Sequence, residues 1–164
     1  MVANRSQEAD SPVEVDVLVV GAGAAGMTAA LVGALEGLDV LLCEKSAQVG
    51  GTTATSAGTI WVPGTRQARE AGFTDGIDDA RRYLDAVIGT ALDDRREAFL
   101  QTGPQVVDYL DRNSDVKFAP YARHPDYLAN LPGATVAGRP LAPLPFDGRL
   151  LGADFALVRP PIGE

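Results

Sequence analysis

The sequence predicts an α/β fold that begins with a strand–helix–strand unit. Residues 13–20 end in the run Val17–Val20, which is apolar, mostly β-branched and typical of a buried strand. Residues 24–36 are rich in Ala and Leu and favour a helix, and Gly37 provides a C-terminal stop for it. Residues 39–43 form a second apolar strand, so the two strands are expected to be parallel with a right-handed crossover.

The composition is that of a folded protein without a nucleic-acid partner. The chain has 164 residues, 46% of them hydrophobic, and a formal net charge of −8, so it lacks the basic footprint that phosphate backbones need. Cys43 is the single cysteine, which excludes a multi-cysteine metal centre, and we expect no metal site. The polar leader, residues 1–12, has no signal-peptide pattern, and we expect a cytoplasmic protein. The uncharged run 17–35 is interrupted by four glycines, so no membrane span is predicted.

Helices are predicted to follow the first unit. Residues 76–89 carry an apolar stripe at helical spacing, and residues 93–101 form a second helix with acidic residues in its first turn. Thr102 is expected to cap a third helix, with Gln105 completing a capping box. Residues 116–118 are expected to form a short strand.

The composition changes after residue 119. Eight of the 11 prolines lie in residues 120–164, a stretch that cannot form long helices and that we expect to be extended. The predicted organisation is therefore a leader (1–12), the amino-terminal part of a nucleotide-binding domain (13–119), and a Pro-rich segment near a substrate site (120–164). Only two strands of the first sheet are evident, so that sheet is expected to be incomplete in this chain.

A glycine-rich turn joins the first strand to the first helix. Gly21 allows a tight turn, Gly23 lets a pyrophosphate approach the backbone, and Gly26 lets the helix pack closely on the strand. Free amides at the helix start, including those of Ala24 and Ala25, are suited to bind the anion. The alternative is a Gly-rich turn of another α/β protein.

Glu44 supports a Rossmann-like dinucleotide-binding unit. It follows the second strand, 18 residues after Gly26, where a carboxylate accepts hydrogen bonds from ribose hydroxyls. A second glycine pair soon afterwards favours FAD over NAD, since the chain would return to the pyrophosphate and then pass the flavin ring. An ordinary flexible loop is the alternative. The predicted cofactor residues of this stretch are Lys45, Ser46, Gly50, Gly51, Thr52, Thr53, Ser56, Ala57, Gly58 and Thr59.

These motifs resemble a known family. Residues 16–26, Glu44 with Lys45, and residues 50–52 are similar to the amino end of the fumarate reductase/succinate dehydrogenase flavoprotein superfamily. The segment 56–63, which ends in Ile-Trp-Val-Pro, resembles its 3-ketosteroid Δ1-dehydrogenase branch. Further similar segments are residues 80–84, 125–127, 138–139, 143–146 and 151–154.

The resemblance implies an FAD enzyme that desaturates the A ring of a 3-oxosteroid and passes electrons to an external acceptor. In the family a tyrosinate removes a proton beside the carbonyl, and flavin N5 takes the hydride. Tyr127 aligns with the family tyrosine that flanks the steroid and assists the base, whereas the base itself comes from later regions. Relatives with covalent flavin use a histidine near the glycine pair; residues 52–58 have none, so FAD is expected to be non-covalent.

Two departures from the family pattern leave the substrate open. Leu128 stands where the family often has a second tyrosine, and Pro140 replaces a serine after Gly138 and Arg139. A steroid-like cyclic ketone remains the expected substrate. One alternative is an alkene reductase like fumarate reductase. The other is a non-catalytic fragment, or half of a split flavoprotein that needs a second chain.

Overall fold

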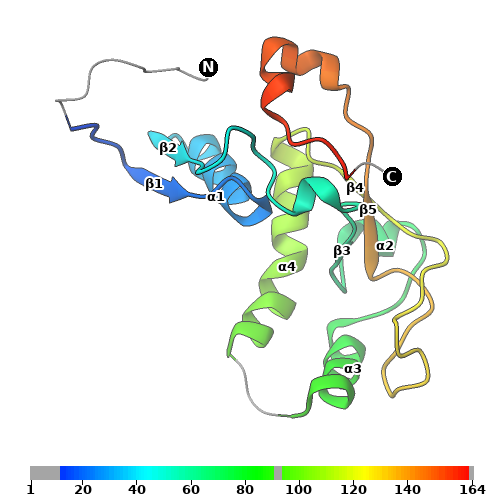
Figure 1. Cartoon of the computed structure of the whole chain (residues 1–164). Helices are drawn as coiled ribbons and strands as arrows, with labels where there is room; N and C mark the ends of the chain where they lie inside the picture. Colours follow the sequence, from blue (N-terminus) through cyan, green and yellow to red (C-terminus); the bar gives the residue numbers. More distant parts are fainter. Residues whose placement is uncertain (1–11, 91–93, 163–164) are drawn as a thin grey trace. The chain divides into compact units, whose positions relative to one another are not determined.

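The computed structural model describes residues 12–90 and 94–162, and these residues divide into two compact units (Figure 1). The first unit contains the chain up to Ala57 together with the residues from Asp147 onward, and the second unit is Gly58–Phe146. Each unit is described separately below. The domain boundaries at residues 12 and 119 stay a prediction.

The first unit contains the predicted strand–helix–strand arrangement. Strand β1 (Val17–Val20), helix α1 (Ala24–Leu35) and strand β2 (Val40–Cys43) follow one another, and β1 and β2 pair in parallel. The helix begins at Ala24 as predicted, and Gly37 has a positive φ of 85° just after its end. The sequence predicted that this strand begins at residue 13, whereas β1 begins at Val17.

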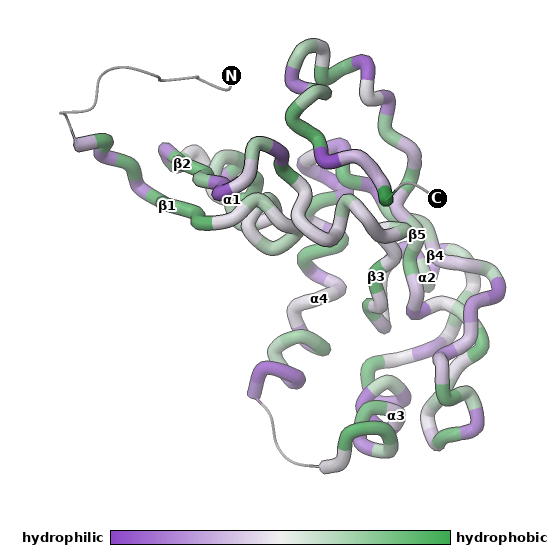
Figure 2. Tube along the Cα trace, in the orientation of Figure 1, coloured by the Kyte–Doolittle hydropathy of each residue, from purple (hydrophilic) through white to green (hydrophobic). Residues whose placement is uncertain are grey.

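The strands of this sheet are less buried than the sequence predicts. Val19 is buried, but Leu18 and Val20 are 59% and 82% exposed, although the run is apolar throughout (Figure 2). The physical reason is that helix α1 packs on the face that carries Val19. The opposite face is not covered by any other residue that the structure describes.

Gly26 is the point at which α1 meets β1. A Cβ atom added there would overlap the carbonyl oxygen of Gly21 and lie 3.0 Å from its carbonyl carbon and 3.3 Å from Cγ1 of Val19. Because the first two obstacles are backbone atoms, no rotamer change can remove them. Only glycine allows the helix to approach the strand this closely.

The first unit also contains two short 3₁₀ helices. They are η1 (Thr53–Thr55) and η2 (Gly148–Leu157), the latter kinked at Gly152. A parallel bridge joins Val49 to Val158. The Pro-rich segment is therefore not extended throughout, because residues 146–159 contain no proline and are free to turn.

A three-stranded antiparallel sheet forms the centre of the second unit. Strands β3 (Ile60–Trp61), β4 (Phe118–Pro120) and β5 (Pro140–Pro143) are ordered β3-β5-β4. The prolines stand at strand ends, where a missing N–H disturbs the ladder least. Strand β4 begins at Phe118, the last residue of the strand predicted at 116–118.

Three helices accompany this sheet. Helix α3 (Ile77–Ile88) lies where residues 76–89 predicted it. Helix α2 (Arg66–Glu70) was not predicted; it is capped by buried Thr65, whose side chain accepts a hydrogen bond from the amide of Ala68 at 3.3 Å. Five residues are too few to show a helical period in the sequence.

The prediction of a helix over residues 93–101, followed by a separate helix capped by Thr102, is wrong, because α4 (Asp94–Asn113) is continuous. Thr102 does not cap a helix; its hydroxyl donates to the carbonyl oxygen of Ala98 at 2.6 Å within α4. Helix α4 tolerates Pro104 because its buried residues Leu100, Val107 and Leu110 continue on one stripe across the proline. Val107 packs in a core with Val62 and Leu141.

We expect Gly26→Ala to destabilise the chain by about 2 kcal/mol or more, in the range of overpacked cores, because its methyl group would overlap the Gly21 carbonyl. Urea denaturation followed by circular dichroism measures the change. Ala29→Ser, on an exposed position of the same helix, is the control and should change stability by less than about 0.5 kcal/mol. Equal stability of the two variants would contradict the close approach.

Candidate dinucleotide site

The glycine turn leaves the start of helix α1 open. Gly21 adopts a positive φ of 103°, and its amide donates to the carbonyl oxygen of Cys43 at 2.7 Å. Gly23 is the N-cap of α1, and no side chain caps the helix there. A Cβ atom at Gly23 would meet nothing within 4 Å. Amides of the first turn, where Ala24 and Ala25 are exposed, are thus available to an anion.

The Glu44 carboxylate is held by two backbone amides. Its Oε2 accepts from the amide of Ala22 at 2.7 Å, and its Oε1 accepts from the amide of Ser46 at 3.0 Å. These hydrogen bonds, that from Ala22 first, lower the pKa of Glu44 below its ordinary value. The carboxylate is therefore ionised near neutral pH, and each oxygen retains a second acceptor position.

The second glycine pair returns to the first turn. The amide of Gly50 donates to the carbonyl oxygen of Ala22 at 2.7 Å. A Cβ atom added at Gly51 would lie 3.1 Å from Cα of Gly23, so the two backbones touch. Both Gly50 and Gly51 have positive φ, at 112° and 54°. The sequence therefore brings together two glycine segments separated by more than 20 residues.

The other predicted cofactor residues lie on both units. Lys45, Thr52 and Thr53 are exposed in the first unit, and the Ser46 hydroxyl donates to the carbonyl oxygen of Gln48 at 2.6 Å. Within the first unit, Ser56 donates to the carbonyl oxygen of Thr53 at 2.8 Å, and Ala57 ends that unit. Gly58 and Thr59 begin the second unit, where the Thr59 hydroxyl lies 3.3 Å from that of Tyr121.

The residues present in the first unit fit a bound dinucleotide. Uncapped amides and open space at Gly23 suit a pyrophosphate, and an ionised carboxylate with spare acceptor positions suits ribose hydroxyls. The close backbone contact at Gly51 leaves no room for a side chain between the two segments. The amides and the carboxylate are the groups expected from the sequence to bind the pyrophosphate and the ribose, and their role toward a dinucleotide stays a prediction.

A buried ion cluster organises the second unit. Arg139 is fully buried, and its Nε and Nη2 donate to the two carboxylate oxygens of Asp75 at 2.8 and 2.6 Å. Its Nη1 donates to Asp126 at 2.8 Å, and Nη2 also donates to the carbonyl oxygen of Gly133 at 2.6 Å. Each nitrogen of this buried guanidinium therefore donates to an acceptor, and the acceptors lie on two loops, one between α2 and α3 and one between β4 and β5.

Two aromatic rings complete the cluster. The Trp61 indole N–H donates to Asp126 at 2.7 Å, and the guanidinium carbon lies 5.5 Å from the Trp61 ring centroid. The Tyr83 ring lies 5.7 Å from the same carbon. Sequence comparison pointed to the segments of Asp126 and Arg139 separately. Their pairing was missed because 13 residues separate them without a regular element.

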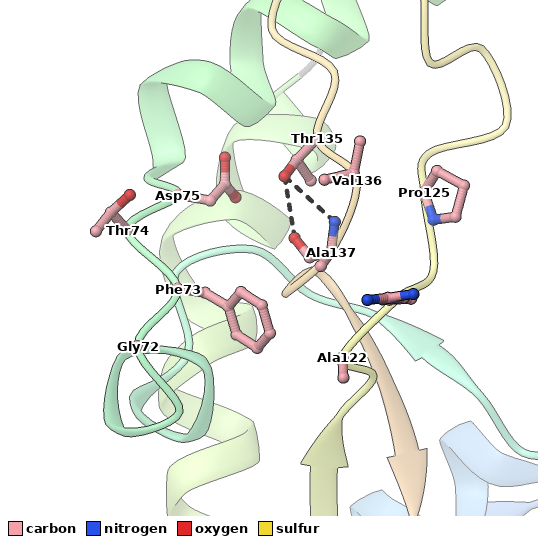
Figure 3. A pocket seen from close by; sticks show the side chains of 10 residues that line it. Gly72, Phe73, Thr74, Asp75, Ala122, Pro125, Thr135, Val136 and Ala137 are labelled. Carbon is pink, nitrogen blue, oxygen red and sulfur yellow. Dashed lines mark hydrogen bonds between the residues drawn. The ribbon is translucent and has the colours of Figure 1, made fainter.

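Tyr127 directly follows buried Asp126 but is itself 94% exposed. The cluster thus fixes the backbone at Tyr127, whereas its ring contacts little of the second unit. An open hollow of about 590 Å³ is lined by residues that include Phe73, Asp75 and Pro125, the last of which is two residues before Tyr127 (Figure 3). On its wall, the Thr135 hydroxyl donates to the carbonyl oxygen of Ala137 at 3.0 Å and accepts from the amide of Ala137 at 3.5 Å. Tyr127 is not among its lining residues, so the hollow is not built around the predicted catalytic side chain.

Two kinds of site are absent from the described part of the chain. Over residues 12–90 and 94–162, no group of three or more His, Cys, Asp or Glu side chains is arranged to hold a metal ion. Over the same residues, no helix has the length and apolar character needed to cross a membrane.

Comparison with protein families shows which family this chain belongs to. The family model described as "FAD binding domain" matches residues 16–159, nearly the whole described chain. The chain belongs to this family. FAD is the cofactor of the family, as the glycine pair predicts.

Two of the curated relatives that match are a 3-oxosteroid dehydrogenase and a dehydrogenase of an oxocyclohexene carboxylate. A 3-oxosteroid 1-dehydrogenase from Mycolicibacterium smegmatis is 38% identical over 152 residues, which cover 92% of this chain and 27% of the relative. A 4-oxocyclohex-2-ene-1-carboxylate 5-dehydrogenase from Sinomonas cyclohexanicum is 44% identical over 146 residues, covering 88% and 24% respectively. The chain thus spans about a quarter of the length of the relatives that it matches.

A solved structure shows the same fold. The crystal structure of 3-ketosteroid delta1-dehydrogenase from Sterolibacterium denitrificans, in complex with 1,4-androstadiene-3,17-dione, has a TM-score of 0.84 and 41% sequence identity. The match covers 90% of this chain and 26% of that chain. The predicted similarity to flavin-dependent steroid dehydrogenases is confirmed, and the fold is that of their FAD-binding region.

We expect Arg139→Met to lower the free energy of unfolding by about 3–5 kcal/mol, because it leaves the buried carboxylate of Asp126 without its cation. Urea denaturation provides the measurement. Arg112→Met is the matched control: this exposed arginine pairs with Asp108 in the same unit, and its loss should cost less than about 1 kcal/mol. Equal losses would show that the cluster does not stabilise the unit.

Proposed function

We propose that this chain is the FAD-binding part of a dehydrogenase that introduces a double bond into a cyclic ketone. The proposal rests on one observation: Ala22 links the two glycine segments and Glu44. Its carbonyl oxygen accepts from the amide of Gly50, and its amide donates to the ionised Glu44 carboxylate. This arrangement supports the proposal of a Rossmann-like dinucleotide site, because the chain belongs to a family that binds FAD.

Each part of the proposed site has a separate role toward FAD. The amides after Gly23 bind the pyrophosphate, Glu44 accepts from ribose hydroxyls, and the segment from Thr52 onward passes the flavin. Gly58 and Thr59 extend that segment toward the flavin in this proposal. FAD is held non-covalently, since no histidine lies in residues 52–58. When bound, FAD supplies the hydride acceptor of the reaction.

The proposed substrate is a 3-oxosteroid or a smaller cyclic ketone. Relatives of both kinds match at similar identity, 38% for the steroid enzyme and 44% for the cyclohexene carboxylate enzyme. Tyr127, exposed beside the anchored Asp126, is positioned to contact a ligand that the rest of an active site would bring to it. Leu128 and Pro140, where the family pattern differs, are proposed to influence which ketone is accepted.

Turnover is proposed to need groups beyond these 164 residues. The chain spans about a quarter of its relatives, and the family base is expected in a later region. We therefore expect the chain alone to bind FAD but to show no ketone-dependent dye reduction. The same proposal has three further parts. An external acceptor takes the electrons, a second chain supplies the missing groups, and the protein is cytoplasmic.

Gly23→Val tests the FAD site. Residue 23 has extended backbone and open surroundings, so valine should leave the fold intact while its side chain meets the pyrophosphate. We expect FAD affinity, measured by quenching of flavin fluorescence, to fall at least tenfold. Gly76→Val is the matched control, because Gly76 is also an open, extended N-cap but lies in the second unit. Unchanged FAD binding by the Gly23 variant would reject the site.

Tyr127→Phe tests the catalytic assignment. In the catalytically active form of the protein, removing the hydroxyl should slow turnover by about 10²-fold or more and leave KM within a few-fold, as expected when a proton-transfer group is lost. Steady-state dye reduction with a 3-oxosteroid and a cyclohexenone carboxylate provides the measurement. Leu128→Ala should change KM rather than kcat. Normal turnover by the Phe variant would remove Tyr127 from the mechanism.

A further inference from the structure

Arg159 lies beside the glycine pair, although it is more than 100 residues away in sequence. Its amide donates to the carbonyl oxygen of Val49 at 3.0 Å, next to the parallel bridge between Val49 and Val158. A Cβ atom added at Gly50 would lie 3.8 Å from Cβ of Arg159. The side chain therefore starts at the loop that returns to the first turn.

The Arg159 guanidinium reaches the end of the segment that carries Glu44. Its Nη2 donates to the Ser46 hydroxyl at 3.4 Å, a long hydrogen bond. Ser46 in turn gives its amide to the Glu44 carboxylate. The Arg159 side chain therefore runs along the loop from residue 50, near its Cβ, to residue 46, near its guanidinium. This loop borders the proposed ribose and pyrophosphate positions.

This cation is poorly satisfied by the protein. Its Nε is buried and donates to no acceptor, and over the described residues no carboxylate forms an ion pair with it. Buried donors are normally paired, so an unpaired one needs an explanation. The arrangement contrasts with Arg139 in the second unit, whose donors are matched by two carboxylates and a carbonyl oxygen.

The charges of the first unit leave Arg159 available to pair with an anionic ligand. Among its described residues, three side chains are cationic: Lys45, Arg149 and Arg159. Arg149 is paired with Asp147 on the surface, and Lys45 is exposed. A diphosphate would add two negative charges to a unit in which Glu44 is already ionised. Arg159 is the cation placed to offset them.

We propose that Arg159 is a further residue of the dinucleotide site and that its guanidinium donates to the diphosphate of the ADP half of FAD. A planar fork of donors suits phosphate oxygens, and binding would give the guanidinium the acceptors that the protein does not provide. The inference rests on the proposed FAD function and extends the site to the carboxyl-terminal part of the first unit.

ADP and adenosine titrations of the full chain test the inference, since only ADP carries the diphosphate. Arg159→Gln should weaken ADP binding about tenfold or more, the effect of losing a charge-assisted hydrogen bond, and leave adenosine binding unchanged. Arg159→Lys keeps the charge and should lose less ADP affinity than the Gln variant. The salt dependence of ADP binding should also become shallower in the Gln variant. Arg149→Gln is the control and should bind ADP like the wild type.

Three results would overturn the inference. ADP affinity that stays unchanged in Arg159→Gln would show that the guanidinium does not meet the ligand. Equal losses in the Lys and Gln variants, or equal losses for ADP and adenosine, would show that Arg159 only supports the loop. A separate outcome, failure of the wild-type chain to bind either FAD or ADP, would reject the proposed function itself, which the three results above leave intact.

Discussion

The backbone of Ala22 is the point on which the first unit depends. Its amide donates to Glu44 and its carbonyl oxygen accepts from Gly50, so one fully buried residue joins the glycine turn, the end of β2 and the second glycine pair. Backbone groups serve this purpose well because their positions do not depend on side-chain rotamers. A cofactor site assembled from three separate segments needs such a fixed reference, since small displacements would misalign the amides and the carboxylate.

The second unit solves a similar problem with charge. Arg139 joins loops that carry Asp75, Asp126 and Gly133, where short strands provide few backbone hydrogen bonds. Burying an arginine is costly unless it is paired and hydrogen-bonded, and here each guanidinium nitrogen donates to an acceptor and two carboxylates pair with the charge. In the loop before Tyr127, the cluster adds side-chain hydrogen bonds to the backbone bonds that His124 and Asp126 donate to Val136 and Thr135. The two units therefore reach a defined local geometry by different physical means.

The sequence was sufficient to predict the strand–helix–strand part of the first unit, but not its two 3₁₀ helices. Periodicity and the positions of Gly21, Gly26 and Gly37 act locally, so β1, α1 and β2 were found with small errors at their ends. Burial of β1 was not predictable, because it depends on what covers the second face of the sheet. Thr102 was misread because the continuity of α4 is decided by its packing against Val62, not by local capping preference.

The residues of the proposed dinucleotide site could be found from the sequence only where they lie in a single motif. The glycines and Glu44 have a recognisable spacing, whereas Arg159 and the Arg139 cluster are assembled by tertiary contacts across long loops. No spacing rule connects Ser46 with Arg159 or Asp75 with Arg139. Such pairs can be identified only from the tertiary structure, which shows which side-chain donors have acceptors and which have none.

The place of Trp61 in the buried cluster gives the protein an internal optical reporter. It is the one tryptophan of the sequence, its indole N–H is bonded to Asp126, and its ring faces a guanidinium. Indole emission depends strongly on the polarity and charges around the ring. Ultraviolet fluorescence will therefore follow the integrity of the second unit, while the visible emission of flavin would report on the proposed site in the first. The two halves of the molecule can thus be observed separately in a single unlabelled sample.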